Sequence, residues 1–142
     1  MKNLLFVLGL IFVIPSCEEA DESDFLDSEC GQTTIVDNNL YKNGQSGSFS
    51  IRNISVVGDC LEVEIQSIGC ASESWELNLV DSGGVAESNP EQRFLKLFLD
   101  NEELCTAVIG KTFSFDLKPL RTGNDVVLLN LEMWDEQIRY EY

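Results

Sequence analysis

Residues 60–66 read Cys60-Leu61-Glu62-Val63-Glu64-Ile65-Gln66, and this stretch decides the fold class. Apolar and polar side chains alternate strictly, so Leu61, Val63 and Ile65 share one face while the polar residues share the other. Successive side chains of a β-strand point to opposite faces, whereas a helix would need a period near 3.6. The pattern predicts a strand with one face buried.

The same alternation recurs along the chain and favours an all-β fold. Gly, Asn and Asp clusters separate the apolar stretches and predict turns. Nothing indicates a helix beyond one turn at Asp100–Leu104. Seven to nine short strands predict an antiparallel two-sheet sandwich, loosely immunoglobulin-like, with a small β-barrel as the alternative. The clear strands are 60–66, 75–79, 113–117 and 127–133, and the less regular ones are 33–36, 49–57, 93–99, 107–109 and 138–142.

Composition limits the function classes. The 142 residues fit one domain, and 25 Asp and Glu against nine Lys and Arg give a formal charge of -16. Such a charge repels phosphate backbones, so we expect no nucleic-acid partner. The chain has no His, which excludes imidazole-based triads and metal sites built on imidazole. We expect no cofactor, no metal site and no enzymatic activity, because no nucleophile and base are arranged together.

The N-terminus has the pattern of a secretory signal peptide. A short head containing Lys2 precedes eleven apolar residues, Leu4 to Ile14. A membrane-spanning helix needs about 20 apolar residues, so this segment is too short to span. We assign residues 1–16 to the signal peptide.

The next residues, Ile14-Pro15-Ser16-Cys17, resemble the bacterial lipobox, although Pro15 is an unusual occupant. The resemblance implies that Cys17 becomes the acylated N-terminus, carrying palmitate or a similar lipid. Two or three acyl chains would hold the protein firmly on a membrane, since each buried CH₂ contributes about 0.8 kcal/mol. The alternative is an ordinary signal peptide that leaves a free Cys17 thiol.

An acidic segment follows Cys17, with seven acids in the twelve residues from Glu18 to Glu29. Like charges and little apolar area keep such a run from folding alone, so we expect residues 17–29 to form a lipidated tether. The segment also resembles the acidic export signal of cell-surface lipoproteins of the Bacteroidota type. That resemblance implies an outer-membrane location, facing outward, and a solvated spacer is the alternative.

Four cysteines remain beyond Cys17, an even number that suits two disulfides in an oxidising compartment. Cys60 and Cys70 flank one strand and lie too far apart to pair with each other. Of the two remaining pairings we favour Cys30–Cys60 with Cys70–Cys105, because Cys70 and Cys105 both lie where a strand ends in a turn.

A binding surface is predicted on residues 93–99, where Phe94, Lys96 and Phe98 alternate with buried leucines. The alternative is that this strand is covered on both sides. Trp134 is the second candidate, as an exposed indole at a strand end, whereas Trp75 alternates with Leu77 and is expected in the core.

Two polar segments lie between the predicted strands. Acids at positions 100, 102 and 103 are expected to form a solvated turn and not a cation site. The polar stretch Val85–Glu91 is where a protease-inhibitor-like loop would lie.

Short motifs spread over the mature chain, including Gly58-Asp59-Cys60, Gly69-Cys70 and the final Tyr140-Glu141-Tyr142, resemble small cell-envelope lipoproteins of the Bacteroidota type. A weaker likeness, of architecture, is to NigD-type lipoproteins, which end in a β-sandwich. The resemblance implies secretion and location but no activity. We therefore expect a non-catalytic, lipid-anchored module over residues 30–142 that binds an envelope protein or a glycan. An accessory subunit of an outer-membrane complex and a loop-presenting inhibitor are the alternatives.

Overall fold

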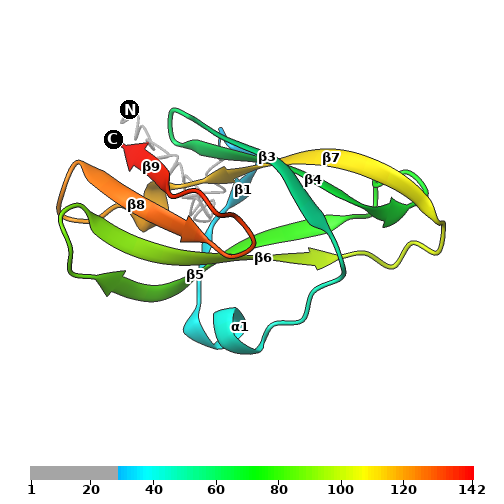
Figure 1. The fold of residues 1–142 in the computed structure, drawn as a ribbon, viewed down its shortest axis with the longest axis horizontal. Coiled ribbons are helices and arrows are strands. Elements are labelled where there is room, and N and C mark those ends of the chain that lie inside the picture. Colours follow the sequence, from blue (N-terminus) through cyan, green and yellow to red (C-terminus); the bar gives the residue numbers. More distant parts are fainter. Residues whose placement is uncertain (1–28) are drawn as a thin grey trace, which may run out of the picture.

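A computed structural model describes residues 29–142 (Figure 1). The predicted signal peptide, the lipidation residue Cys17 and nearly all of the tether lie outside the described residues. No helix in the described part of the chain is long and apolar enough to cross a membrane. The elements are β1 Gln32–Thr33, β2 Ile35–Val36, α1 Asn38–Asn43, β3 Ser50–Val57, β4 Cys60–Gly69, β5 Glu76–Ala86, β6 Glu91–Asp100, β7 Ala107–Asp116, the 3₁₀ turn η1 Lys118–Leu120, β8 Val126–Leu131 and β9 Ile138–Glu141.

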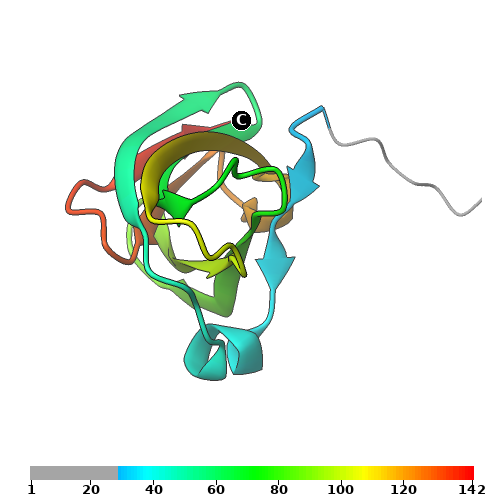
Figure 2. The ribbon, with the colours of Figure 1, turned by 90° about the vertical axis from the view of Figure 1, so that its right-hand side faces the viewer.

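The strands form two separate sheets, with orders β1-β7-β4-β3 and β2-β5-β6-β8-β9. Figure 2, which looks along the long axis, shows them enclosing a common interior with α1 outside. The predicted two-sheet sandwich is confirmed, and the closed-barrel alternative is wrong because the described strands belong to two open sheets.

The two sheets are mixed and not purely antiparallel as expected. Three pairs, β1 with β7, β2 with β5 and β6 with β8, are parallel. Between β6 and β8 the chain passes through β7 in the other sheet, so it re-enters the second sheet in its former direction. A period-two pattern indicates which face is buried but does not indicate strand direction.

Inward-facing apolar side chains from both sheets form one core. The three inward residues of 60–66 are fully buried, and Trp75 is 3% exposed, as predicted. Met133 is an exception: it was expected to continue the inward face of β8, yet it is 61% exposed. Strand β8 ends at Leu131, and Met133 has φ of 71°, so the alternation stops before it.

One edge of the sandwich is closed by a segment that belongs to both sheets. The sequence predicts a single strand over 33–36, but β1 pairs with β7 in the first sheet and β2 pairs with β5 in the second. Thr34 lies between them and is buried, and its Oγ1 donates a 2.6 Å hydrogen bond to the Asp116 carbonyl. This bond satisfies the buried hydroxyl at the point where the segment changes sheets.

Helix α1 was not predicted. Asp37 is its N-cap, and the Asp37 carboxylate accepts a 2.9 Å hydrogen bond from the Leu40 N–H. The following residues 44–49, here called the strap, cross the outer face of the second sheet. Gly44 is required there, because a Cβ would lie 2.5 Å from the Phe98 ring.

Both disulfides have the pairing that we favoured. Cys30–Cys60 has a Cα–Cα distance of 5.2 Å, and Cys70–Cys105 one of 4.9 Å. The two bridges flank opposite ends of β4, a ten-residue strand that spans about 33 Å. We call the end near Cys30 and Cys60 the tether end, because the described chain begins there, and the opposite end the distal end.

Candidate interaction site

The outer face of β6 carries the side chains that the sequence analysis proposed as a binding surface. Phe94, Lys96 and Phe98 do point outward, but only Phe94 is open, at 40% exposure. Lys96 Nζ lies 2.9 Å from a Glu132 carboxylate oxygen and 4.8 Å from the centre of the Tyr41 ring. The ion pair with Glu132 raises the pKa of Lys96. These contacts leave the lysine little capacity for a ligand.

The strap passes over the Phe98 ring, hydrogen-bonds to the Leu99 backbone and leaves a groove on each side. A groove of about 470 Å³ is lined by residues including Asn78, Phe98 and Asn101, and one of about 400 Å³ by residues including Phe49, Lys96 and Met133. Phe98 lies beneath the strap, between the two grooves. Both of the interpretations that the sequence left open therefore hold in part, since the Phe98 end of β6 is covered and the Phe94 end is open.

Trp134 does not join this surface. It is half-buried against the core and lines a groove with Ile54 and Val56 of β3 and Ile138 of β9. This position is the edge of the sandwich opposite β1 and β2. The indole closes the gap between the sheets, so it is not the freely exposed indole that was expected.

A second candidate lies at the distal end, in residues 101–106, here called the distal loop. The loop joins β6 to β7 and contains no regular secondary structure. The single helical turn predicted at Asp100–Leu104 is therefore wrong. Side chains at its alternate positions 101, 103 and 105 attach it to the end of β4 and to the loop that follows β4.

Glu103 makes the largest set of these attachments. One of its carboxylate oxygens accepts hydrogen bonds from the backbone N–H groups of Cys70 at 2.5 Å, Ala71 at 3.2 Å and Ser72 at 3.4 Å, and the other accepts one from Ser74 Oγ at 2.9 Å. Desolvation favours the neutral acid, but these four donors outweigh it and lower the pKa of Glu103 to about 2. The carboxylate acts as a fixed anchor for the loop.

Asn101 and Cys105 hold the two ends of the distal loop. Asn101 Nδ2 donates to the Ile68 carbonyl at 2.8 Å, and Asn101 Oδ1 accepts from the Glu103 N–H at 3.0 Å. Cys105 is covalently joined to Cys70. Leu104 lies between the two anchored residues Glu103 and Cys105, and its side chain is 95% exposed, the highest value among the exposed large apolar residues described.

Sequence reasoning missed Leu104 because its exposure depends on the contacts of Glu103 and Cys105 with a loop distant in the sequence. The signal that could have found it is the sequence Glu102-Glu103-Leu104-Cys105, in which an isolated leucine sits between acids and a disulfide cysteine. The contribution of Glu103 could not be read from the sequence, since its partners are backbone groups about thirty residues away.

Two further expectations concern loops. Of the acids at 100, 102 and 103, Glu103 is engaged by the loop after β4. Within residues 29–142 no group of three or more Asp, Glu, Cys or His side chains is placed to hold a metal. In the stretch Val85–Glu91, Val85 and Ala86 end β5 and Glu91 begins β6, so the loop itself is the four-residue connection 87–90.

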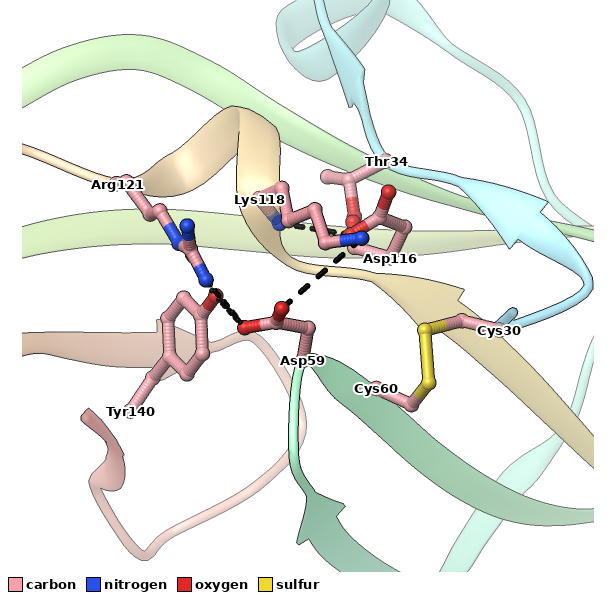
Figure 3. Close-up of a disulfide and its surroundings, with 8 residues drawn as sticks. All are labelled: Cys30, Thr34, Asp59, Cys60, Asp116, Lys118, Arg121 and Tyr140. Carbon is pink, nitrogen blue, oxygen red and sulfur yellow. Dashed lines mark hydrogen bonds and ion pairs between the residues drawn. A yellow bond between two sulfur atoms is a disulfide. The ribbon is translucent and has the colours of Figure 1, made fainter. Parts of the chain in front are cut away.

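The tether end is closed by a polar cluster beside the Cys30–Cys60 disulfide (Figure 3). Asp59 Oδ1 accepts 2.6 Å hydrogen bonds from the Tyr140 hydroxyl and from Arg121 Nη2, while Arg121 Nε donates to the Tyr140 oxygen at 3.0 Å. The bond from Tyr140 has the largest effect on Asp59 and, with that from Arg121, lowers the pKa of the carboxyl. Burial and the bond to Asp59 raise the pKa of Tyr140 to about 12. The donors and acceptors of this cluster are directed at one another, which indicates a structural role.

Comparison with known proteins supports the architecture. No protein-family model matches the chain, and no curated protein matches it. Among solved structures, it is similar to a NigD-like immunity protein from Bacteroides caccae, with 10% identity over 77% of this chain and a TM-score of 0.53. A protein of unknown function, DUF1344, from Bacteroides vulgatus has 17% identity over 78% of this chain and a TM-score of 0.48.

At these identities the likeness concerns the fold alone. The chain spans 59% of the NigD-like protein and 54% of the DUF1344 protein. The expected architectural likeness to NigD-type proteins agrees with this finding.

Proposed function

We propose that the chain is a lipid-anchored, non-enzymatic lipoprotein of the outer membrane that binds a protein partner through its distal loop. The observation that carries the proposal is the position of Leu104, an almost fully exposed leucine on a loop held by a disulfide and by Glu103. An aliphatic side chain of this kind gains most from burial in a protein pocket, so we favour a protein partner over a glycan.

The arrangement of the two ends supports a display role. The described chain begins beside Cys30 at the tether end, and the distal loop lies at the other end of β4 (Figure 1). A lipid on Cys17 would therefore hold the tether end near the membrane and direct the distal loop away from it. The four cysteines of residues 29–142 are all paired, which is the parity expected if Cys17 alone is used for lipid attachment.

A non-enzymatic role is supported by the surroundings of the carboxylates. Asp59 and Glu103 each accept several hydrogen bonds from neighbouring groups, and Asp81 forms a bidentate pair with Arg93 inside the sandwich. Carboxylates engaged in this way are fixed as structural acceptors, whereas a general base needs a free oxygen facing a cleft. The description of the solved NigD-like protein as an immunity protein is compatible with an interaction module.

The alternative of a complex subunit that docks through the Phe94 face has less support. Of the three side chains proposed for this face only Phe94 is open, because the strap lies over Phe98 and Lys96 is paired with Glu132. The two surfaces can be separated experimentally, since Phe94 and Leu104 lie on different parts of the molecule.

The proposal is tested by capture from native membranes with variants at position 104. The protein carries a C-terminal tag, which lies near the tether end (Figure 1) and leaves the distal loop free. We compare the wild type with Leu104→Asp and with a matched control, Val57→Asp, because Val57 is an exposed apolar residue (59%) beside Cys60 at the tether end. The Cys17→Ala variant tests the anchor in the same fractions.

The expected result is a stoichiometric partner with the wild type and Val57→Asp and none with Leu104→Asp. Retention of the partner by Leu104→Asp, or its loss with Phe94→Asp alone, would assign the contact to another surface. Recovery of the wild type without any partner would contradict a stable protein complex. Cys17→Ala is expected in the soluble fraction, and its persistence in membranes would refute lipid anchoring at Cys17.

A further inference from the structure

We propose that the distal loop binds the active-site cleft of an endopeptidase whose primary specificity pocket accepts leucine, and that the protein thereby inhibits that class of peptidase. The inference rests on the proposed function and names the partner of the same site. The inhibitory loop that the sequence analysis considered at residues 85–91 is here assigned to residues 101–106.

The first argument is the alternation of attached and exposed side chains in the distal loop. Peptidase clefts bind substrates as extended chains, in which alternate side chains point to opposite sides. Residues 101–106 belong to no helix or strand, and none has a positive φ. Residues 101, 103 and 105 are attached to the protein, whereas Glu102 and Leu104 are exposed. The loop therefore presents Glu102 and Leu104 outward, with the alternate spacing that such a cleft reads.

The second argument is rigidity. Ordering a flexible loop opposes binding, and a loop already held in its bound form avoids much of that loss. The distal loop is held on each side of Leu104, by the four hydrogen bonds to Glu103 and by the Cys70–Cys105 disulfide. Leu104 is thus presented as a fixed anchor for an apolar pocket.

The third argument explains why the loop would inhibit and not be consumed. Hydrolysis of the Leu104–Cys105 bond adds one water, giving a carboxylate on Leu104 and an ammonium on Cys105. Both new ends stay attached, because Glu103 remains bound to the N–H groups of residues 70–72 and Cys105 remains joined to Cys70. The ends cannot diffuse apart, so the reverse reaction, which expels that water, competes with release of the cleaved chain.

The charge of the loop restricts the peptidase further. Glu102 lies beside Glu103 and is exposed, and the molecule as a whole is acidic, with a formal charge of -16. A cleft with an acidic rim would repel this surface. The expected partner has an apolar pocket for Leu104 and a neutral or basic rim.

The test measures inhibition of defined peptidases by the purified full-length chain. Chymotrypsin and subtilisin are the probes because their pockets accept large apolar side chains, and trypsin, whose pocket binds cations, is the counter-probe. We expect inhibition of at least one of the two apolar-specific enzymes. Leu104→Lys should weaken that inhibition by about 100-fold and create inhibition of trypsin. The control Val57→Lys adds the same charge and should leave the inhibition of the apolar-specific enzymes and the lack of trypsin inhibition as in the wild type.

A second variant tests the role of the bridge. Replacing Cys70 and Cys105 together with Ser should turn the loop from an inhibitor into a substrate, seen as rapid chain cleavage at Leu104. The proposal is overturned if the wild type inhibits neither chymotrypsin nor subtilisin, or if Leu104→Lys leaves inhibition unchanged. If inhibition is absent while membrane capture still depends on Leu104, the inhibitor inference fails and the interaction function stands. If both are absent, the distal loop is not the functional site.

Discussion

Tyr140 provides a prediction whose size can be worked out from the structure. Its ring is fully buried, and its hydroxyl donates to Asp59 and accepts from Arg121 (Figure 3). Burial and the neighbouring Asp59 carboxylate disfavour the phenolate, and the pKa of Tyr140 rises from about 10 to about 12 in the folded protein. The free energy of unfolding therefore depends on whether this hydroxyl is protonated.

The sign follows from the raised pKa. The folded state retains the proton more strongly than the unfolded chain, so the stabilisation is complete below the unfolded pKa of about 10 and is lost as pH rises towards 12. A difference of this size corresponds to about 3 kcal/mol of stabilisation in total, of which about half is lost by pH 11.

The assay is urea unfolding at several pH values for the wild type, Tyr140→Phe and the control Tyr41→Phe, which removes a phenol outside the cluster. Tyr140→Phe should cost about 1–2 kcal/mol at neutral pH, because Asp59 loses a donor. Between pH 9 and 11 the difference in unfolding free energy between wild type and Tyr140→Phe should shrink by about 1 kcal/mol. The reasoning is refuted if that difference is independent of pH, or if Tyr41→Phe removes the same alkaline loss.

Three further predictions concern other parts of the molecule. Arg93→Met leaves the buried Asp81 carboxylate without its partner and should lower the free energy of unfolding by about 3–5 kcal/mol. The double variant Arg93→Met with Asp81→Leu should recover most of that loss, and a double variant as unstable as Arg93→Met alone would contradict the prediction. Gly44→Ala should destabilise by about 1–3 kcal/mol because the methyl group meets the Phe98 ring, and an unchanged thermal midpoint would show that the strap moves freely. Glu103 has a folded pKa of about 2, so its stabilisation is present above the ordinary carboxyl pKa and is lost as pH falls towards 2. Glu103→Gln should remove that acid dependence in unfolding curves measured against pH.

The buried faces of the strands were predictable, because a period of two determines which residues face inward. Leu61, Val63 and Ile65 are the clearest case. Strand β7 was predicted in two pieces, 107–109 and 113–117, since Gly110-Lys111-Thr112 interrupts the apolar pattern. The strand is continuous because residues 110–112 keep their backbone pairing with β4, and the Lys111 ammonium donates to the Ser72 carbonyl at 2.7 Å.

Features that depend on distant partners were not predictable. The Gly83-Gly84 pair indicates a turn, yet β5 continues through it as a bulge, with Gly83 at φ of 77°. The Asp81–Arg93 pair lies on the inward side of β5 and β6, where a hydrophobic pattern predicts apolar residues. Leu104 was missed for the same reason, since its exposure depends on contacts that Glu103 and Cys105 make with the loop after β4.

The two ends of the sandwich use similar chemistry with different consequences. At the tether end Asp59 receives its hydrogen bonds from side chains of β9 and of the segment after η1, which draws these segments together over the end of the core. At the distal end Glu103 receives its hydrogen bonds chiefly from backbone N–H groups. Backbone donors use no side chains of the partner loop, so the same kind of anchor leaves the neighbouring Leu104 uncovered. Stability alone would be served as well by a loop that folds Leu104 against Trp75 and the core; a fixed loop that keeps a leucine in solvent favours a contact outside the chain.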